Sequence, residues 1–572
     1  MIPNINTYID IHAYRQGGWV EGRIFLISDL DGSPKLYEFK DDKFKVLTPD
    51  LDRVTGYRKD LKNKVIFPIH DVNGNERWYI TGIDIYKGEK LFTLGDGKSI
   101  NIPGEAYEEE KIIPYATNRS DPRLFEVYIY NYGTGEEYKI FGPYENIYPI
   151  QISPDGDKLV ISKSNATWEQ NIYVVDVETG EVIDSIEYPD THFSSIQWID
   201  NEKLYLVTDY NSDKRYIAEY TLNTSFEKIL EEEYEIEMMK YRDGNLIYSV
   251  NVSGDSVIKI DDEEIKKPKG VLAYIDVDGE PLFSLNTVRY GESIWILKDG
   301  KLEPIKYCDK FNELANHLSE PKIYKTIASD GLEIESLVYK AKDSRGTIIY
   351  PHGGPESQSR PIYNPLIQVL VNNGYTVVQP NYRGSTGYGK RFRHLDDRRN
   401  RERSLKDIVE VLYDLSQKGV IEKDKTAVIG GSYGGFATLY LITHYPDLWR
   451  AAVSVVGISN LETFLRNTGP WRRRLREREY GSLDNDLDFL RKISPIYYID
   501  RIVAPLLLIH GRNDPRVPVE ESIQIYEKLK SLNRDVDIYI FEDEGHGVAK
   551  HRNRVIYIKL ILDWISKYMN SI

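Results

Sequence analysis

The pattern of apolar and polar residues changes near residue 310. Residues 20–305 consist of short β-like runs separated by turns rich in Gly, Asp and Asn, with no long amphipathic helix pattern. From residue 322 onward, apolar strand-like runs alternate with helical patterns, which is typical of a mainly parallel sheet. A chain of 572 residues is also too long for a single core, so at least two large domains are expected.

A unit of about 40 residues recurs in the first region. Each unit has an apolar strand, a polar or Asp-Gly turn, a strand rich in Tyr, Val and Ile, and a Gly turn into a further strand. Four strands per unit at this period predict a seven-bladed β-propeller, and a pair of β-sandwiches is the alternative. The seven units begin near Arg23, Lys64, Ile113, Tyr148, His192, Glu235 and Leu272.

The second region is expected to form an α/β domain with helices on both faces of its sheet. Its last helix is predicted at about residues 552–568. The predicted strands are Thr347–Tyr350, Thr376–Gln379, Thr426–Ile429, Ala451–Val455, Leu506–His510 and Val536–Phe541. We therefore divide the chain into an N-terminal extension (1–20) that packs on the α/β domain, a propeller (21–307), a linker with one short helix (308–321) and the α/β domain (322–572).

Ser432 lies in the glycine-rich segment Gly430–Gly435, between a strand pattern and a helix pattern. A Gly-x-Ser-x-Gly sequence in this setting is typical of a nucleophile elbow. The elbow needs glycine because the turn is crowded, and only a residue without Cβ fits beside the serine. An ordinary Gly-rich turn is the alternative if this hexapeptide is considered alone.

Two residues that a nucleophilic serine requires follow Ser432. Asp514 comes 82 residues later and His546 a further 32 residues later, each near the end of an apolar strand-like run. Ser, Asp and His in this order are the catalytic triad of α/β-hydrolases, in which His activates the serine and Asp orients the imidazole. The sequence therefore predicts a serine hydrolase whose second domain is an α/β-hydrolase domain.

The net charge of −16 is unevenly distributed. Residues 1–310 hold 36 Lys and Arg against 57 Asp and Glu, whereas residues 311–572 hold 38 against 33. The acidic first half argues against a nucleic-acid partner. The second half contains two basic stretches, residues 391–403 and 472–478. Such runs usually form faces exposed to solvent, but the alternative is that they bind the acidic ends of peptides or the acidic propeller itself.

The remaining composition argues against several classes of protein. Cys308 is the only cysteine, so an internal disulfide is excluded and no metal-ligand cluster is present. No phosphate loop or cofactor fingerprint is found, and we expect neither a cofactor nor a metal. The apolar runs are too short for a membrane span, and the first 18 residues lack the apolar segment of a secretory signal. A cytoplasmic protein is expected, and a homo-oligomer is left open.

The chain resembles the prolyl oligopeptidase family, in which a propeller covers an α/β-hydrolase domain. His-Gly-Gly-Pro combined with Gly-x-Ser-Tyr-Gly-Gly is most similar to the acylaminoacyl-peptidase branch. Prolyl oligopeptidases proper tend to carry Tyr in place of His352, and dipeptidyl peptidases of the fourth type tend to carry Trp in place of Gly431. The motifs that carry the resemblance are His352–Pro355, Asn381–Gly389, Gly430–Phe436, Asp514–Pro518 and Gly545–Gly547.

The resemblance implies further site residues. The backbone N–H groups of Gly354 and Tyr433 would form the oxyanion hole, and His352 would pack or hydrogen-bond within its loop. Arg516 matches a family arginine near the substrate's carbonyl groups, with a salt bridge between the domains as the alternative. The resemblance also implies an apolar S1 pocket formed by Leu461, Phe464 and Trp471. The alternative is that these three residues belong to the hydrophobic core.

The predicted function is therefore a serine peptidase that acts on short peptides. It would release N-acylated or N-terminal residues after an apolar P1 residue, with the propeller as a size filter. The alternatives are a carboxylesterase, or a dipeptidyl peptidase or oligopeptidase of the same family. A non-catalytic propeller interaction protein is a further alternative, against which the intact Ser432, Asp514 and His546 argue.

Overall fold

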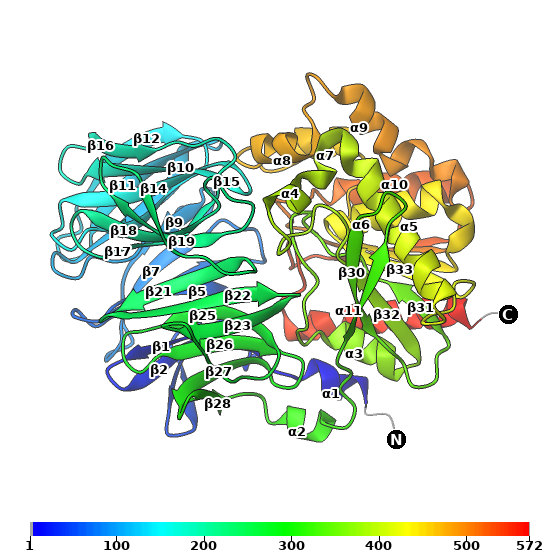
Figure 1. Cartoon of the computed structure of the whole chain (residues 1–572), viewed down its shortest axis with the longest axis horizontal. Helices are drawn as coiled ribbons and strands as arrows, with labels where there is room; N and C mark the ends of the chain where they lie inside the picture. Colours follow the sequence, from blue (N-terminus) through cyan, green and yellow to red (C-terminus); the bar gives the residue numbers. More distant parts are fainter. Residues whose placement is uncertain (1–3, 571–572) are drawn as a thin grey trace.

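The computed structural model describes residues 4–570, which form a β-propeller and an α/β domain lying side by side (Figure 1). The propeller contains seven four-stranded antiparallel sheets, each built from four consecutive strands. The predicted seven-bladed propeller is confirmed, and the alternative of two sandwiches is wrong. Because each blade is continuous in sequence, the ring closes by packing of β1 in the first blade against β25 in the seventh.

The blades follow one another in chain order. The first two comprise β1 (Tyr14–Val20), β2 (Arg23–Ser28), β3 (Lys35–Lys40), β4 (Lys43–Val46), β5 (Arg53–Asp60), β6 (Val65–Asp71), β7 (Tyr79–Asp84) and β8 (Lys90–Leu94). The next two comprise β9 (Asn101–Pro103), β10 (Ile112–Asp121), β11 (Leu124–Asn131), β12 (Glu137–Tyr144), β13 (Ile147–Ile152), β14 (Lys158–Ala166), β15 (Glu169–Asp176) and β16 (Val182–Ile186).

The last three blades complete the ring. They comprise β17 (Phe193–Trp198), β18 (Lys203–Thr208), β19 (Tyr216–Thr221), β20 (Phe226–Leu230), β21 (Ile236–Arg242) and β22 (Asn245–Val252). The remaining strands are β23 (Asp255–Ile260), β24 (Glu263–Glu264), β25 (Gly270–Asp276), β26 (Leu282–Thr287), β27 (Gly291–Lys298) and β28 (Lys301–Lys306).

The α/β domain contains one eight-stranded sheet in the order β29-β30-β32-β31-β33-β34-β35-β36. The six strands from β32 to β36 are parallel, and β29 and β30 form an antiparallel edge. The predicted strands are all present, within two residues of their predicted ends. The strands are β29 (Lys322–Ile327), β30 (Glu333–Tyr339), β31 (Gly346–Ile349), β32 (Tyr375–Pro380), β33 (Thr426–Gly431), β34 (Ala451–Val455), β35 (Leu506–Gly511) and β36 (Val536–Phe541).

Helices cover both faces of this sheet, as predicted. They are α3 (Pro365–Asn372), α4 (Lys390–Arg393), α5 (Arg401–Gln417), α6 (Tyr433–His444), α7 (Leu461–Asn467), α8 (Arg473–Tyr480), α9 (Leu487–Ile493), α10 (Glu520–Ser531) and α11 (His551–Met569). Short 3₁₀ turns lie at His394–Asp396, Arg398–Asn400, Pro446–Leu448, Pro495–Tyr497 and Ile499–Arg501.

The central strand β33 shows why the sheet needs two layers of helices. Val428 packs in the core formed with α5 and α6, whereas Ala427 and Ile429 pack in the core formed with α3 and α11. Successive side chains of a strand point to opposite faces, so an uninterrupted apolar run requires burial on both. The elbow that follows β33 is therefore attached to a strand that is buried on both faces.

The N-terminal segment contributes to both domains. Helix α1 (Ile5–Ile9) lies on the α/β domain, where the hydroxyl of Tyr363 donates to the carbonyl of Tyr8 at 2.7 Å. Strand β1 then belongs to the first blade, so the propeller begins at Tyr14 and not at residue 21. Helix α2 (Lys310–Leu314) lies in the predicted linker. Within residues 4–570, no helix is both long and apolar enough to cross a membrane.

Candidate active site

Ser432 occupies a strained turn between β33 and α6. Its backbone has φ 57° and ψ −121°, a conformation that costs a non-glycine residue on the order of 1–3 kcal/mol. The Ser432 N–H donates to the carbonyl of Val455 at 2.9 Å, which holds the turn in place. A Cβ on Gly430 would lie 2.0 Å from the carbonyl oxygen of Gly434, so the crowding that the elbow predicts is present.

Asp514 and His546 meet Ser432 at the C-terminal edge of the sheet. They lie in the loops that follow β35 and β36, and α/β proteins place their ligands at this edge. His546 Nε2 lies 3.0 Å from Ser432 Oγ, and His546 Nδ1 lies 2.7 Å from Asp514 Oδ2. In a neutral imidazole with its proton on Nδ1, Nε2 is free to accept the serine proton.

The carboxylate of Asp514 is held in its ionised form. Its Oδ1 accepts the backbone N–H groups of Arg516 at 2.8 Å and Val517 at 3.0 Å. Burial alone would raise the pKa of Asp514, but the charge of His546 and the hydrogen bonds from His510 and His546 lower the pKa well below its usual range. The negative charge is therefore available to stabilise an imidazolium.

The loop that carries Gly354 passes directly beside the nucleophile. A Cβ on Gly353 would lie 3.4 Å from the Cβ of Ser432, so little space separates the two segments. Gly354 has φ 118°, which only glycine adopts without strain. The structure thus brings the segment of Gly354 to Ser432 and starts α6 at Tyr433, as an oxyanion hole of these two N–H groups requires.

His352 is fixed within the same loop. Its ring stacks on that of Tyr382 with centroids 4.3 Å apart, and its Nε2 lies 2.8 Å from Ser385 Oγ. Burial lowers the pKa of His352 to about 4, so the ring is neutral near physiological pH. These contacts fit a packing role and not a second catalytic histidine.

Glu356 lies two residues beyond Gly354, with its side chain 8% exposed. Its Oε2 is 3.6 Å from a terminal nitrogen of Arg476 on α8. Burial, together with the negative charge of Glu479, raises the pKa of Glu356 to about 8. The loop beside Ser432 therefore rests on a carboxyl group that holds its proton more tightly than a free glutamate does.

We expect Glu356→Gln to change how stability depends on pH. The folded-state pKa of about 8 exceeds the ordinary value of 4.5, so the folded protein binds this proton more tightly than the unfolded chain. The contribution of Glu356 to the free energy of unfolding must then fall as pH rises from about 4.5 to about 8, and stay constant above. Because glutamine stays neutral, the variant should gain stability relative to wild type across this window. Urea titrations of both proteins at several pH values measure the difference in their free energies of unfolding. A difference that does not change with pH would contradict the raised pKa of Glu356.

Two cavities reach the triad. One of about 330 Å³ borders Ser432 and His546 and is otherwise mainly apolar. The other, of about 560 Å³, lies between the domains and borders His546 and Arg516. Sequence reasoning missed the apolar lining of the first cavity, because its residues lie in strands and helices that are also core. This lining includes Leu366, Val456, Ile509, Phe541, Val548, Tyr557 and Ile558.

Arg516 forms the salt bridge that was considered as its alternative role, and its place at the substrate's carbonyl groups stays a prediction. Its Nε lies 2.7 Å from Oε1 of Glu76 in the propeller, so it forms a salt bridge between the domains. Both residues also line the 560 Å³ cavity that His546 borders. Sequence reasoning missed Glu76, which lies in a loop between β6 and β7 without any motif around it.

The three residues expected at the S1 pocket lie elsewhere. Leu461 and Phe464 are 0% and 3% exposed in the core of the α/β domain, where Phe464 packs on Tyr480. Trp471 packs against a propeller core, with the guanidinium of Arg77 5.0 Å from its ring centre. None of the three lines either cavity at the triad. The S1 assignment is therefore corrected, because the same apolar character that suits a pocket also satisfies a core.

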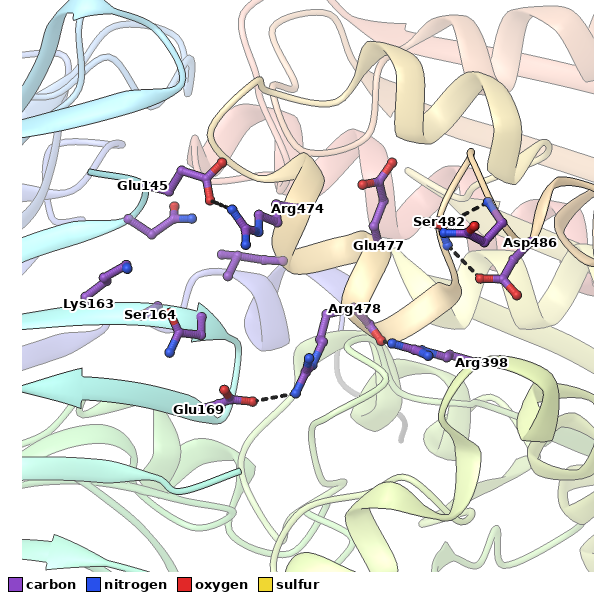
Figure 2. A pocket seen from close by; sticks show the side chains of 14 residues that line it. Glu145, Lys163, Ser164, Glu169, Arg398, Arg474, Glu477, Arg478, Ser482 and Asp486 are labelled. Atoms are coloured by element: carbon purple, nitrogen blue, oxygen red, sulfur yellow. Dashed lines mark hydrogen bonds and ion pairs between the residues drawn. The ribbon is translucent and has the colours of Figure 1, made fainter. Parts of the chain in front are cut away.

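The basic stretches dock onto the acidic propeller. Arg474 lies 2.7 Å from Glu145, and Arg478 lies 2.8 Å from Glu169. Figure 2 shows these two pairs between α8 and the propeller, around a polar cavity of about 620 Å³. Exposed pairs contribute only about 0.2–1 kcal/mol each, so their main effect is to orient the domains. The first stretch adds the pairs Arg391–Asp213, Arg393–Asp209 and His394–Asp190.

Comparison with known proteins supports the family resemblance. The model of the prolyl oligopeptidase family matches residues 363–571. Dipeptidyl peptidase family member 6 of Caenorhabditis elegans is 34% identical over 212 residues, which are 36% of this chain and 29% of that protein. Acylamino-acid-releasing enzyme 1 of Oryza sativa subsp. japonica is 31% identical over 252 residues, which are 42% of this chain and 32% of that protein. The matches thus span about a third of these relatives, and the predicted resemblance is confirmed.

The likeness to solved structures extends over both domains. A crystal structure of puromycin hydrolase superposes with a TM-score of 0.86, covering 100% of this chain and 96% of that chain. The sequence identity is 17%, at which the likeness shows the fold alone. A propeller followed by an α/β-hydrolase domain is therefore a known arrangement.

Proposed function

We propose that this chain, whose C-terminal domain matches the prolyl oligopeptidase family, is a serine peptidase that cleaves short peptides. The observation that carries the proposal is the pair of contacts from His546, 3.0 Å to Ser432 Oγ and 2.7 Å to Asp514. Hydrogen bonds of this length are what a general base and its orienting carboxylate require. A cytoplasmic location and short peptides as partners are part of the same proposal.

The reaction would proceed through an acyl-enzyme. Ser432 Oγ attacks the scissile carbonyl carbon while His546 Nε2 takes the hydroxyl proton, and the N–H groups of Gly354 and Tyr433 bind the oxyanion. His546 then donates that proton to the leaving amine as the C–N bond breaks. Water, activated by the same imidazole, attacks the ester and releases the acid. Asp514 holds the imidazole throughout and stays ionised.

The propeller is proposed to limit the size of the substrate. The propeller contacts the loop of His546 directly through Gly74, which lies between β6 and β7. The two segments are so close that a Cβ on Gly545 would lie 2.0 Å from the carbonyl oxygen of Gly74. The cavity of about 560 Å³ at His546 is likewise lined mostly by propeller residues. A short peptide fits into this cavity between the domains, whereas a long or folded polypeptide does not.

We expect an octapeptide to be cleaved much faster than unfolded casein that contains similar local sequences. The reason is that the scissile bond must enter the space between the domains. Rates of both reactions, followed by mass spectrometry with equal concentrations of cleavable bonds, measure the effect. Equal rates for the two substrates would show that the propeller is not a size filter.

The proposal covers peptides with either a free or an acylated N-terminus. Leu461 and Phe464 are core residues, so the apolar P1 preference expected from sequence now depends on the mainly apolar 330 Å³ cavity beside Ser432. A carboxylesterase is the second candidate, favoured by the mainly apolar 330 Å³ cavity beside Ser432. Acetylated, free and ester forms of one residue test both candidates. A peptidase cleaves at least one of the amides with a useful kcat/KM, whereas hydrolysis of the ester alone would contradict the proposal.

A further inference from the structure

Arg472 differs from the other arginines of the stretch 472–478, because each of those has a carboxylate partner. Among residues 4–570, no carboxylate lies within the 4.0 Å of an ion pair with Arg472, and its buried Nε has no hydrogen-bond partner. Figure 2 shows Arg474 and Arg478 directed at propeller carboxylates. The pairs are Arg473–Glu477, Arg474–Glu145, Arg476–Glu356 and Arg478–Glu169.

Backbone hydrogen bonds join the segment of Arg472 to the loop that carries Asp514. The N–H of Gly469 donates to the carbonyl of Pro515, next to Asp514, at 3.0 Å. The N–H of Arg472 in turn donates to the carbonyl of Gly469 at 2.7 Å. The segment before α8 is therefore joined to the loop of the catalytic aspartate. In agreement, the charge of Asp514 is among those that act on the Arg472 guanidinium.

Two further arginines lie close enough to Arg472 to repel its charge. Burial, followed by the positive charges of Arg476 and Arg516, lowers the pKa of Arg472 to about 10. Arg516 has Glu76 as its own partner. Arg476 has Glu356 as its partner at 3.6 Å. Arg472 and Arg476 are four residues apart and share one side of α8, so an anion between the domains would face a positive surface there.

We propose that Arg472 binds a carboxylate of the peptide substrate, adjacent to the bond that Ser432 attacks. This inference rests on the proposed peptidase function and names the class of substrate, an acidic peptide. A guanidinium matches a carboxylate geometrically and can donate two hydrogen bonds to it. The carboxylate has two possible sources, the side chain of an acidic P1 residue or the free C-terminus of a short leaving group. An uncharged peptide would leave Arg472 half-buried and unpaired, so it would bind less well.

Two matched pairs of peptides distinguish the sources. One pair has Glu or Gln at P1 with an amidated C-terminus, and the other has Gln at P1 with a free or amidated C-terminus. We expect wild type to favour the acidic member of one pair by about 10- to 100-fold in kcat/KM, the range that a charge-assisted hydrogen bond supplies. Arg472→Gln should abolish this preference, mainly by lowering kcat/KM for the acidic peptide towards the value for the uncharged one. Arg472→Lys should retain part of it.

Arg473→Gln is the matched control, because Arg473 lies on the same helix but already pairs with Glu477 at 2.9 Å. It should keep the wild-type preference. Labelling of Arg472→Gln by a fluorophosphonate at the wild-type rate would show that the variant is folded. If wild type cleaves both members of each pair equally, or if Arg472→Gln keeps the preference, the inference is wrong while the peptidase proposal stands. If none of the peptides is cleaved, both are wrong.

Discussion

Replacing Ser432 with alanine is expected to reduce kcat for peptide hydrolysis by a factor on the order of 10⁴ or more. The hydroxyl is the group that forms the acyl-enzyme, and His546 Nε2, 3.0 Å from Ser432 Oγ, is placed to accept the hydroxyl proton. Alanine removes the nucleophile and one hydrogen bond. Its Cβ fits where the serine Cβ lies, so the elbow keeps its shape.

Initial rates with a cleaved octapeptide measure this loss, with thermal unfolding of the variant as the control for folding. A matched Ser385→Ala variant is informative, because Ser385 contacts His352 and not the triad. It should lose far less activity than Ser432→Ala. A Ser432→Ala protein that keeps more than about a tenth of wild-type kcat would exclude Ser432 as the nucleophile.

The second large effect is expected for Asp514→Asn, which should lower kcat by roughly 10⁴. The carboxylate accepts a hydrogen bond from His546 Nδ1–H, with Nδ1 and Oδ2 2.7 Å apart, and thereby keeps Nε2 free to act as a base. An amide can present its NH₂ group to Nδ1 and favour the opposite tautomer. It also carries no charge to stabilise the imidazolium that forms during attack.

Steady-state kinetics over a range of pH measure this effect, with Asp543→Asn as the control. Asp543 lies near His546 in sequence, but its carboxylate pairs with Lys550 at 3.1 Å and with Arg552. Asp543→Asn should change kcat only a few-fold. Should Asp514→Asn act within about tenfold of wild type, Asp514 would not be the orienting carboxylate.

The number of blades could be predicted, but the first strands of the early blades could not. The first three predicted units begin near Arg23, Lys64 and Ile113, at the starts of β2, β6 and β10. The preceding strand β1 contains two glycines, an arginine and a glutamine, and β9 has only three residues. Such segments lack the apolar run that identifies a strand in a sequence. They are strands because they pair with neighbouring strands, and a sequence pattern does not show this pairing.

The α/β sheet was predictable where it is buried on both faces. The six parallel strands are mainly apolar, whereas β29 is largely exposed and has the sequence Lys-Ile-Tyr-Lys-Thr-Ile. This strand is an antiparallel edge, so only its pairing with β30 identifies it. Edge strands carry lysine and other polar residues, which prevent the open edge from pairing with another chain. Because of these residues, an edge strand does not show the apolar pattern by which strands are predicted.

The triad was predictable because its signals are local and ordered, whereas the substrate-binding surface is not. An elbow is visible in a short segment around Ser432, and the two partners follow in a fixed chain order. The sequence around Leu461 would be equally apolar whether the residue lined a pocket or packed in the core. Glu76 lies in the propeller, far in sequence from the triad residues whose cavity it lines. Arg472 stands in a run of arginines, and only the partners of its neighbours distinguish it.

The proposed peptidase reaction requires Ser432 to be an activated nucleophile. The most direct measurement is to react the wild-type protein with a fluorophosphonate, digest it and locate the adduct by tandem mass spectrometry, with and without a cleavable peptide present. We predict one adduct, on Ser432, whose formation the peptide slows by competition. An unlabelled Ser432, or labelling that moves to another serine, would contradict the account.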